Sequence, residues 1–127
     1  MSKKILVVDD EAHIVQLIEQ TLEDLEDEGV ELLVAIDGEE ALSIIKEEHP
    51  ELIFLDVMMP KINGFEVCRI VKNEWRLAAT YIVMLTAKGQ EVDKLKGQEA
   101  GADLYITKPF DPDSLYDKAV EVLALRT

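Results

Sequence analysis

Residues 4–9 read Lys-Ile-Leu-Val-Val-Asp, four consecutive aliphatic residues between a base and an acid. Short unbroken aliphatic runs are typical of strands that are buried on both faces, as in parallel sheets. Similar runs recur along the chain at 32–36, 52–55, 81–85 and, more weakly, 104–106. The sequence therefore predicts five buried strands.

Amphipathic helical patterns lie between these runs. The first covers 11–28, where five apolar residues share one face and Gly29 supplies a stop: Ile14, Leu17, Ile18, Leu22 and Leu25. The second follows a capping sequence that begins at Asp37, the third covers 64–72 and the fourth 90–100. The last opens at Asp111-Pro112 and continues through 125. Strict alternation of strands and helices favours a (βα)5 chain, an α/β domain with a doubly wound parallel sheet.

Polar residues follow four of the predicted strands. Asp9-Asp10-Glu11 follow the first, Asp56 the third, Thr86 the fourth and Lys108-Pro109 the fifth. Each has an ordinary explanation by itself, since acids cap helices, threonine is common in strands and lysine is usually solvated. In an open parallel sheet, however, binding sites form beyond the carboxyl ends of the strands. Their joint placement at one edge indicates a functional site.

The residue types at this edge suit phosphoryl transfer. Asp9, Asp10 and Asp56 would crowd like charges, which a hard divalent cation such as Mg²⁺ relieves. Lys108 and Thr86 would add an ammonium and a hydroxyl group around the oxygens of a phosphoryl group. Asp56 belongs to a central strand between these groups, so it is the candidate nucleophile that forms an acyl phosphate.

The motifs around these residues resemble the receiver domains of bacterial two-component response regulators, the CheY-like family. The resemblance covers nearly the whole chain and rests on ILVVDDE at 5–11, LDVMMPKING at 55–64, MLTA at 84–87 and GADLYITKPF at 101–110. It implies one receiver domain over 1–127 with a flavodoxin-like sheet. The strand order 2-1-3-4-5 is known for this family and comes from the resemblance, not from the periodicity of this sequence.

The resemblance also implies a role for each residue of the acidic site. Asp56 would accept a phosphoryl group from a sensor histidine kinase or a histidine phosphotransfer protein. Asp10, Asp56 and the backbone carbonyl of Met58 would bind Mg²⁺, and Asp9 would act through a bound water. Lys108 would bind the phosphoryl group and precede a cis peptide bond to Pro109.

Such a protein works as a switch rather than as a turnover enzyme. Phosphorylation adds about −1.5 to −2 charge and three acceptor oxygens. By resemblance, Thr86 then moves toward the phosphoryl group and Tyr105 swings inward behind it. The surface of the 90–100 helix, the fifth strand and the last helix would change, controlling an output protein or a missing effector domain. The same surface is a candidate for homodimer formation.

Composition excludes several classes of partner. The 127 residues hold 27 acids against 13 bases, for a net charge of −14 and a pI near 4.4. Direct binding of nucleic acid or of an anionic membrane by this chain is therefore not expected. The excess is concentrated in residues 1–50, with 15 acids against 3 bases, either as a solvated acidic face or as a surface for a basic phosphodonor. One cysteine, Cys68, and no signal-peptide pattern predict a reducing, cytoplasmic location.

Three alternatives to the switch each require a sequence feature that this chain lacks or differs in. A flavin protein of the same fold needs a phosphate-binding loop after the first strand, where this chain has three acids. A phosphohydrolase with an aspartyl nucleophile needs a second acid two residues later, where Met58 stands. A pseudo-receiver that takes no phosphate would lack a site residue, and all of them are present.

Overall fold

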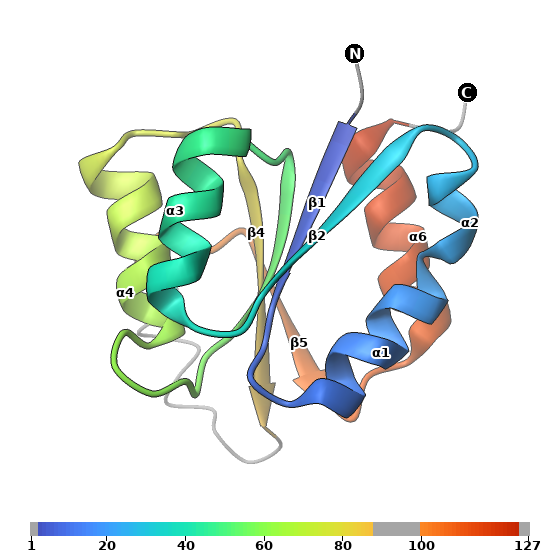
Figure 1. Cartoon of the computed structure of the whole chain (residues 1–127), viewed down its shortest axis with the longest axis horizontal. Coiled ribbons are helices and arrows are strands. Elements are labelled where there is room, and N and C mark those ends of the chain that lie inside the picture. The colour runs from blue at the N-terminus through green and yellow to red at the C-terminus, as the bar shows by residue number, and fades with distance from the viewer. Residues whose placement is uncertain (1–2, 88–99, 125–127) are drawn as a thin grey trace.

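A computed structural model of the chain describes residues 3–87 and 100–124 (Figure 1). Its five strands all run parallel: β1 (Lys3–Val8), β2 (Val30–Ala35), β3 (Leu52–Asp56), β4 (Tyr81–Ala87) and β5 (Leu104–Lys108). They lie in the order β2-β1-β3-β4-β5, which confirms the predicted doubly wound sheet and the strand order that the resemblance implied.

Helices cover both faces of the sheet (Figure 1). One face carries α1 (Ala12–Thr21), α2 (Glu23–Glu26) and α6 (Pro112–Leu123), and the other carries α3 (Gly38–Glu48), α4 (Gly64–Arg69) and a π-helical turn, η1 (Ile70–Glu74). No helix among residues 3–87 and 100–124 is long and apolar enough to cross a membrane.

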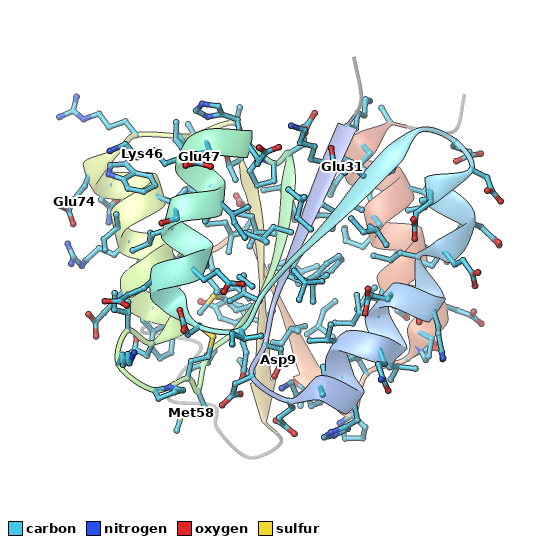
Figure 2. The ribbon with its side chains drawn as sticks, viewed as in Figure 1. Asp9, Glu31, Lys46, Glu47, Met58 and Glu74 are labelled. Atoms are coloured by element: carbon cyan, nitrogen blue, oxygen red, sulfur yellow. The ribbon has the colours of Figure 1, made fainter. Side chains whose placement is uncertain are left out.

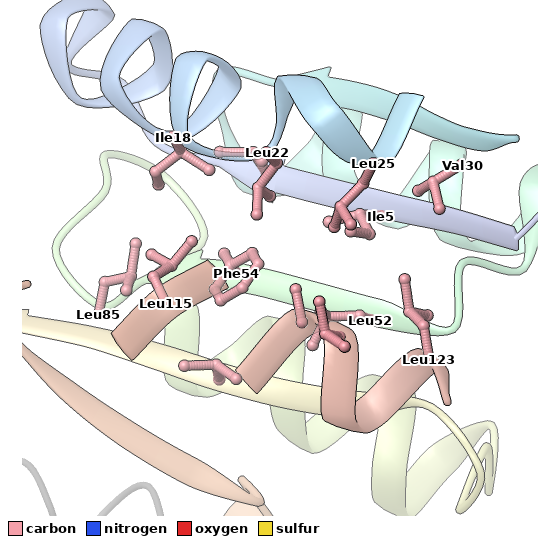
Figure 3. Packing of buried hydrophobic residues seen from close by; sticks show 14 of the residues in the cluster. Ile5, Ile18, Leu22, Leu25, Val30, Leu52, Phe54, Leu85, Leu115 and Leu123 are labelled. Atoms are coloured by element: carbon pink, nitrogen blue, oxygen red, sulfur yellow. The ribbon is translucent and has the colours of Figure 1, made fainter. Parts of the chain in front are cut away.

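The aliphatic runs are continuous because successive side chains of each strand enter two hydrophobic cores, one on each face of the sheet. In β1, Ile5 and Val7 belong to the cluster under α1 and α6, while Leu6 and Val8 belong to the cluster under α3 and α4. All four side chains are fully buried, and β3 alternates in the same way. Figure 3 shows the first cluster, in which Phe54 lies among apolar side chains of α1, α2 and α6. A strand with successive side chains in two cores must be apolar at every position.

The helix predicted over 11–28 is interrupted at Leu22, whose ψ of 6° departs from helical geometry and separates α1 from α2. Leu17, which the sequence placed on the apolar face of this helix, is 38% exposed, while Val15 is buried with Ile18. Val15, Ile18 and Leu22 recur at spacings of three and four, so Leu17 falls beside this stripe rather than within it. Gly29 ends the region as predicted, with a φ of +90°.

The predicted helix starts at Asp37 and Asp111 are confirmed. Asp37 Oδ1 accepts a hydrogen bond of 2.9 Å from the Glu40 backbone N–H, and Asp111 Oδ1 accepts one of 3.1 Å from Asp113. The helix predicted over 90–100 lies outside the described residues except for Ala100, which is helical and buried. Residue 125, the predicted end of the last helix, also lies outside them.

Lys72 joins three segments at the amino-terminal edge of β4. Its Nζ lies 2.9 Å from Asp103 Oδ2 and donates hydrogen bonds to the backbone carbonyls of Ala78, at 3.4 Å, and of Thr80. Asp103 Oδ2 also accepts a bond of 2.8 Å from the Ile82 backbone N–H. The π-helical turn that contains Lys72 was not predicted, since the 64–72 pattern indicated an ordinary helix.

We expect Lys72→Met to lower the free energy of unfolding by about 2 kcal/mol, because it leaves a partly buried carboxylate and a strand-edge carbonyl without their cation. Urea unfolding measures this loss. The matched control is Arg69→Met, which breaks an ion pair whose two side chains are more than half exposed and should cost less than about 1 kcal/mol. Equal losses in the two variants would show that burial of the Lys72 pair is unimportant.

Candidate functional site

Four carboxylates gather at the carboxyl ends of β1 and β3. Asp9, Asp10, Glu11 and Asp56 each place an oxygen within 4.8 Å of the others. Asp9 and Asp56 are buried, at 1% and 4% exposure, whereas Asp10 and Glu11 are exposed. Figure 2 shows Asp9 and Met58 at the same end of the sheet, opposite the end that carries Glu31. The predicted cluster forms because β1 and β3 are neighbours in the sheet.

Backbone groups of the loops that follow hold the two buried carboxylates. Asp9 Oδ1 accepts a hydrogen bond of 2.9 Å from the Glu11 N–H, and Asp56 Oδ1 accepts one of 3.2 Å from the Met58 N–H. The Asp9 N–H donates to the Ala35 carbonyl at 3.2 Å, which continues the pairing of β1 with β2. Each carboxylate is therefore oriented by the chain two residues later.

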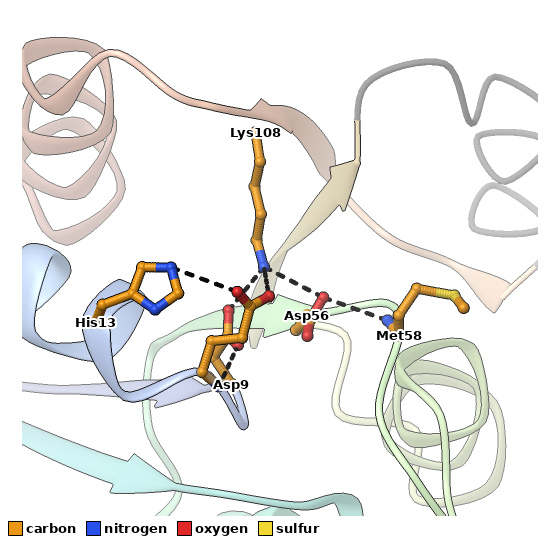
Figure 4. Close-up of polar contacts among 6 residues, drawn as sticks. Asp9, His13, Asp56, Met58 and Lys108 are labelled. Carbon is orange, nitrogen blue, oxygen red and sulfur yellow. Dashed lines mark hydrogen bonds and ion pairs between the residues drawn. The ribbon is translucent and has the colours of Figure 1, made fainter.

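Lys108 brings the positive charge to this cluster from the end of β5 (Figure 4). Its Nζ donates to Asp9 Oδ2 at 2.9 Å and lies 3.5 Å from both Asp56 Oδ1 and Glu11 Oε1. Burial by itself lowers the pKa of Lys108, but the hydrogen bond to Asp9 and the surrounding carboxylates outweigh it and raise the pKa above its ordinary value. The ammonium therefore stays charged. The peptide bond to Pro109 is cis, as the resemblance implied.

Burial and crowding perturb the Asp56 carboxyl. Burial and the negative charge of Asp9 raise its pKa, Lys108 and the Met58 N–H lower it, and the net result is a pKa of about 6. Both dominant causes act against the carboxylate form. An added cation would relieve them, and an all-oxygen donor set of this kind matches the ligand preference of Mg²⁺.

Thr86 and Tyr105 lie on β4 and β5, the two strands beyond β3 in the sheet. Thr86 is 2% exposed and follows Leu85, the register partner of Asp56 on β4. Its hydroxyl makes no hydrogen bond to the carboxylates or to Lys108 among the described residues. Tyr105 packs against the α3 and α4 cluster, and its buried hydroxyl has no hydrogen-bond partner in the part of the chain that the structure describes. Burial, followed by the nearby Cys68, raises the pKa of Tyr105 to about 12.

Geometry thus joins some of the predicted site residues and leaves others apart. Asp9, Asp10, Asp56 and Lys108 come together, with the Met58 backbone beside them, while within the described part of the chain Thr86 and Tyr105 make no hydrogen bond to these groups. The Met58 side chain is 61% exposed. Glu11 belongs to the cluster; the sequence placed it after the first strand but gave it no role in the site, because a glutamate before a helix has the same local pattern as a solvated or capping residue.

Comparison with known proteins agrees with this geometry. Residues 5–120 match the family model described as the response regulator receiver domain. The alkaline phosphatase synthesis transcriptional regulatory protein PhoP of Bacillus subtilis is 47% identical over 123 residues, which is 97% of this chain and 49% of that protein. The chain therefore spans about half the length of this curated relative.

Solved structures give the same result. The chemotaxis response regulator CheY4 of Vibrio cholerae is 34% identical, with a TM-score of 0.83 over 96% of this chain and 99% of that one. The response regulator DrrB, a Thermotoga maritima OmpR/PhoB homolog, is 35% identical, with a TM-score of 0.83 over 98% of this chain and 54% of that one. The chain belongs to the family of response regulator receiver domains of two-component systems.

Proposed function

We propose that this receiver domain is a phosphorylation-dependent signalling switch that accepts a phosphoryl group from a phosphohistidine donor onto Asp56. The observation that carries the proposal is the position of the Asp56 carboxylate. It is buried at the end of a central strand, among three further carboxylates and 3.5 Å from the Lys108 ammonium. A nucleophilic oxygen surrounded by cation-binding groups is the arrangement that phosphoryl transfer requires.

In the proposed step, an oxygen of ionised Asp56 attacks the phosphorus atom of the donor. An O–P bond forms as the P–N bond breaks, and the imidazole nitrogen leaves with the electron pair of that bond. Asp56 Oδ1 is engaged by the Met58 N–H, which leaves Oδ2 without a hydrogen bond among the described residues. Attack of water on the acyl phosphate later returns Asp56 and inorganic phosphate, so the protein resets without being a turnover enzyme.

The residues present fit a bound Mg²⁺. Asp10, Asp56 and the Met58 backbone carbonyl would hold it, with Asp9 acting through a water. Bound Mg²⁺ supplies positive charge against the carboxylates and the phosphoryl oxygens. The raised pKa of Asp56 supports this assignment, since burial first and the charge of Asp9 second destabilise its carboxylate, and a bound cation would offset both.

Three residues would transmit the effect of phosphorylation from Asp56 to the surface of the domain: Lys108, Thr86 and Tyr105. Lys108 would follow the new phosphoryl charge, Thr86 would donate its hydroxyl to it, and Tyr105 would move into the space behind. The Tyr105 hydroxyl, which has no hydrogen-bond partner among residues 3–87 and 100–124, supports such a movement, because a buried hydroxyl without a hydrogen bond is costly to keep.

The proposed partners follow from the family. A cytoplasmic sensor histidine kinase or histidine phosphotransfer protein would supply the phosphoryl group. The output would be a partner protein, a second copy of the chain or an effector domain that contacts β5, α6 and the 90–100 segment. That segment lies almost wholly outside the described residues. The relatives named as transcriptional regulators support an effector that controls transcription.

Treatment with acetyl phosphate and Mg²⁺ followed by intact mass tests the chemistry. The wild-type protein should gain one phosphoryl group, and Asp56→Asn should gain none, because an amide cannot act as the nucleophile. Asp24→Asn, which removes an exposed carboxylate of α2, is the matched control and should behave like the wild type. The assignment fails if the wild type gains no mass or if the gain survives in Asp56→Asn.

A further inference from the structure

Glu11 occupies the position of an N-terminal cap on α1 without acting as one. Its backbone is extended, with φ −94° and ψ 107°, but its side chain accepts no hydrogen bond from the first turn. At the corresponding positions of α3, α4 and α6, the side chains of Asp37, Asn63 and Asp111 all do so. Capping residues are normally short, and glutamate is not among the preferred ones. Its carboxylate has a different partner.

That partner is Lys108. Glu11 Oε1 lies 3.5 Å from Lys108 Nζ, and Glu11 Oε2 lies 3.4 Å from His13 Nε2. The Glu11 N–H donates to the Asp9 carboxylate, so the β1–α1 turn holds the glutamate beside the pocket. The Lys108 side chain is only 15% exposed and serves Asp9, Asp56 and Glu11 together. One ammonium is thus divided among three carboxylates.

The inference rests on the proposed function. If Asp56 accepts a phosphoryl group, the sharing of Lys108 among three carboxylates opposes that phosphorylation. A phosphoryl group on Asp56 adds negative charge on the β3 side, and Lys108 stabilises it only by moving toward it. An ion pair that exists in the unphosphorylated state and is lost afterwards shifts the equilibrium away from the phosphorylated state. Asp9 is expected to contact Mg²⁺ through a water in both states, whereas Glu11 is not among the expected metal-binding groups.

We propose that Glu11 is a positioning residue that retains the Lys108 ammonium on the β1 side of the pocket and so weakens the binding of a phosphoryl group at Asp56. A competing explanation is direct repulsion, because the Glu11 carboxylate lies within 4.8 Å of the other carboxylates and would repel the phosphoryl oxygens without Lys108. The two explanations differ in whether removal of Glu11 matters when Lys108 is absent.

Beryllofluoride, which mimics a phosphoryl group on a carboxylate, is the probe, titrated at saturating Mg²⁺ and followed by NMR. Glu11→Gln should bind it about two- to fivefold more tightly than the wild type, the range of a half-exposed ion pair. Glu19→Gln makes the same charge change on an exposed residue of α1 with no contact to Lys108, and it should leave the affinity unchanged. In a Lys108→Gln background, Glu11→Gln should have no effect.

A spectroscopic measurement keeps the test decisive if a variant binds the probe too weakly. In the free protein, the Lys108 Nζ resonance should shift in Glu11→Gln and not in Glu19→Gln. An unshifted resonance, or a gain in affinity that persists in the Lys108→Gln background, overturns the inference. If the wild type itself fails to bind beryllofluoride, the proposed function fails, while the resonance still reports whether Glu11 holds Lys108.

Discussion

Replacement of Gly64 by alanine is expected to lower the free energy of unfolding by about 3 kcal/mol and to abolish phosphorylation by acetyl phosphate. A Cβ atom at Gly64 would lie 2.4 Å from the backbone oxygen of Asp56 and 2.9 Å from the Val57 Cα. Neither is the flexible end of a side chain, so the backbone that carries the proposed nucleophile must move. Urea unfolding and intact mass measure the two effects.

Glu66→Ala is the matched control for this prediction. It places alanine on an exposed position in the same first turn of α4 and should change stability by less than about 1 kcal/mol. A Gly64→Ala protein that is as stable as this control would show that α4 can withdraw from β3. A stable variant that is still phosphorylated would show in addition that the contact does not position Asp56.

Replacement of Asp56 by asparagine should stabilise the protein while it abolishes phosphoryl transfer. The folded pKa of Asp56 is about 6, above its ordinary value of 3.8. The folded state therefore binds this proton more tightly than the unfolded state does, and the resulting stability is complete below about pH 4 and lost as the pH rises through about 6. At about pH 7.5 without metal, the buried carboxylate costs up to about 3 kcal/mol, which asparagine removes.

Urea unfolding in a chelating buffer at several pH values measures this difference. Asp56→Asn should be more stable than the wild type at about pH 7.5 and nearly equal to it at about pH 4, and added Mg²⁺ should narrow the difference by stabilising the wild type. Asp24→Asn controls for the loss of one negative charge at an exposed position. A variant that is less stable than the wild type at every pH would mean that the ion pair with Lys108 outweighs the cost of burial.

Much of the fold was predictable because its signals are local. The aliphatic run at 5–8 is continuous because its side chains enter two cores, and the acid that follows it marks a strand end. The strand order is a different matter, since periodicity does not say which strands pair. It came from the resemblance to a family, whose motifs identify the chain.

The sequence-based errors share one cause. The place of Leu17 on the apolar face, the unbroken helix over 11–28 and the regular helix through Lys72 were all inferred from spacing along the chain. Spacing along the chain does not contain the contacts between distant residues, such as the ion pair between Lys72 and Asp103. The structure also shows that Asn63 caps α4 and that Gly64 is required by its contact with the Asp56 backbone.

The properties of the candidate site also fall into those that the sequence determines and those that only the tertiary structure determines. The sequence by itself determined which residue types stand at the strand ends, because strand termini follow from local patterns, and it thereby identified Asp9, Asp10, Asp56 and Lys108. Only the tertiary structure decided that Lys108 is shared with Glu11, that Asp56 is buried with a raised pKa and that Gly64 leaves no space for a side chain. These properties depend on distances among β1, β3, β5 and α4, and such distances follow from strand order, register and packing, which a local pattern of residues does not contain.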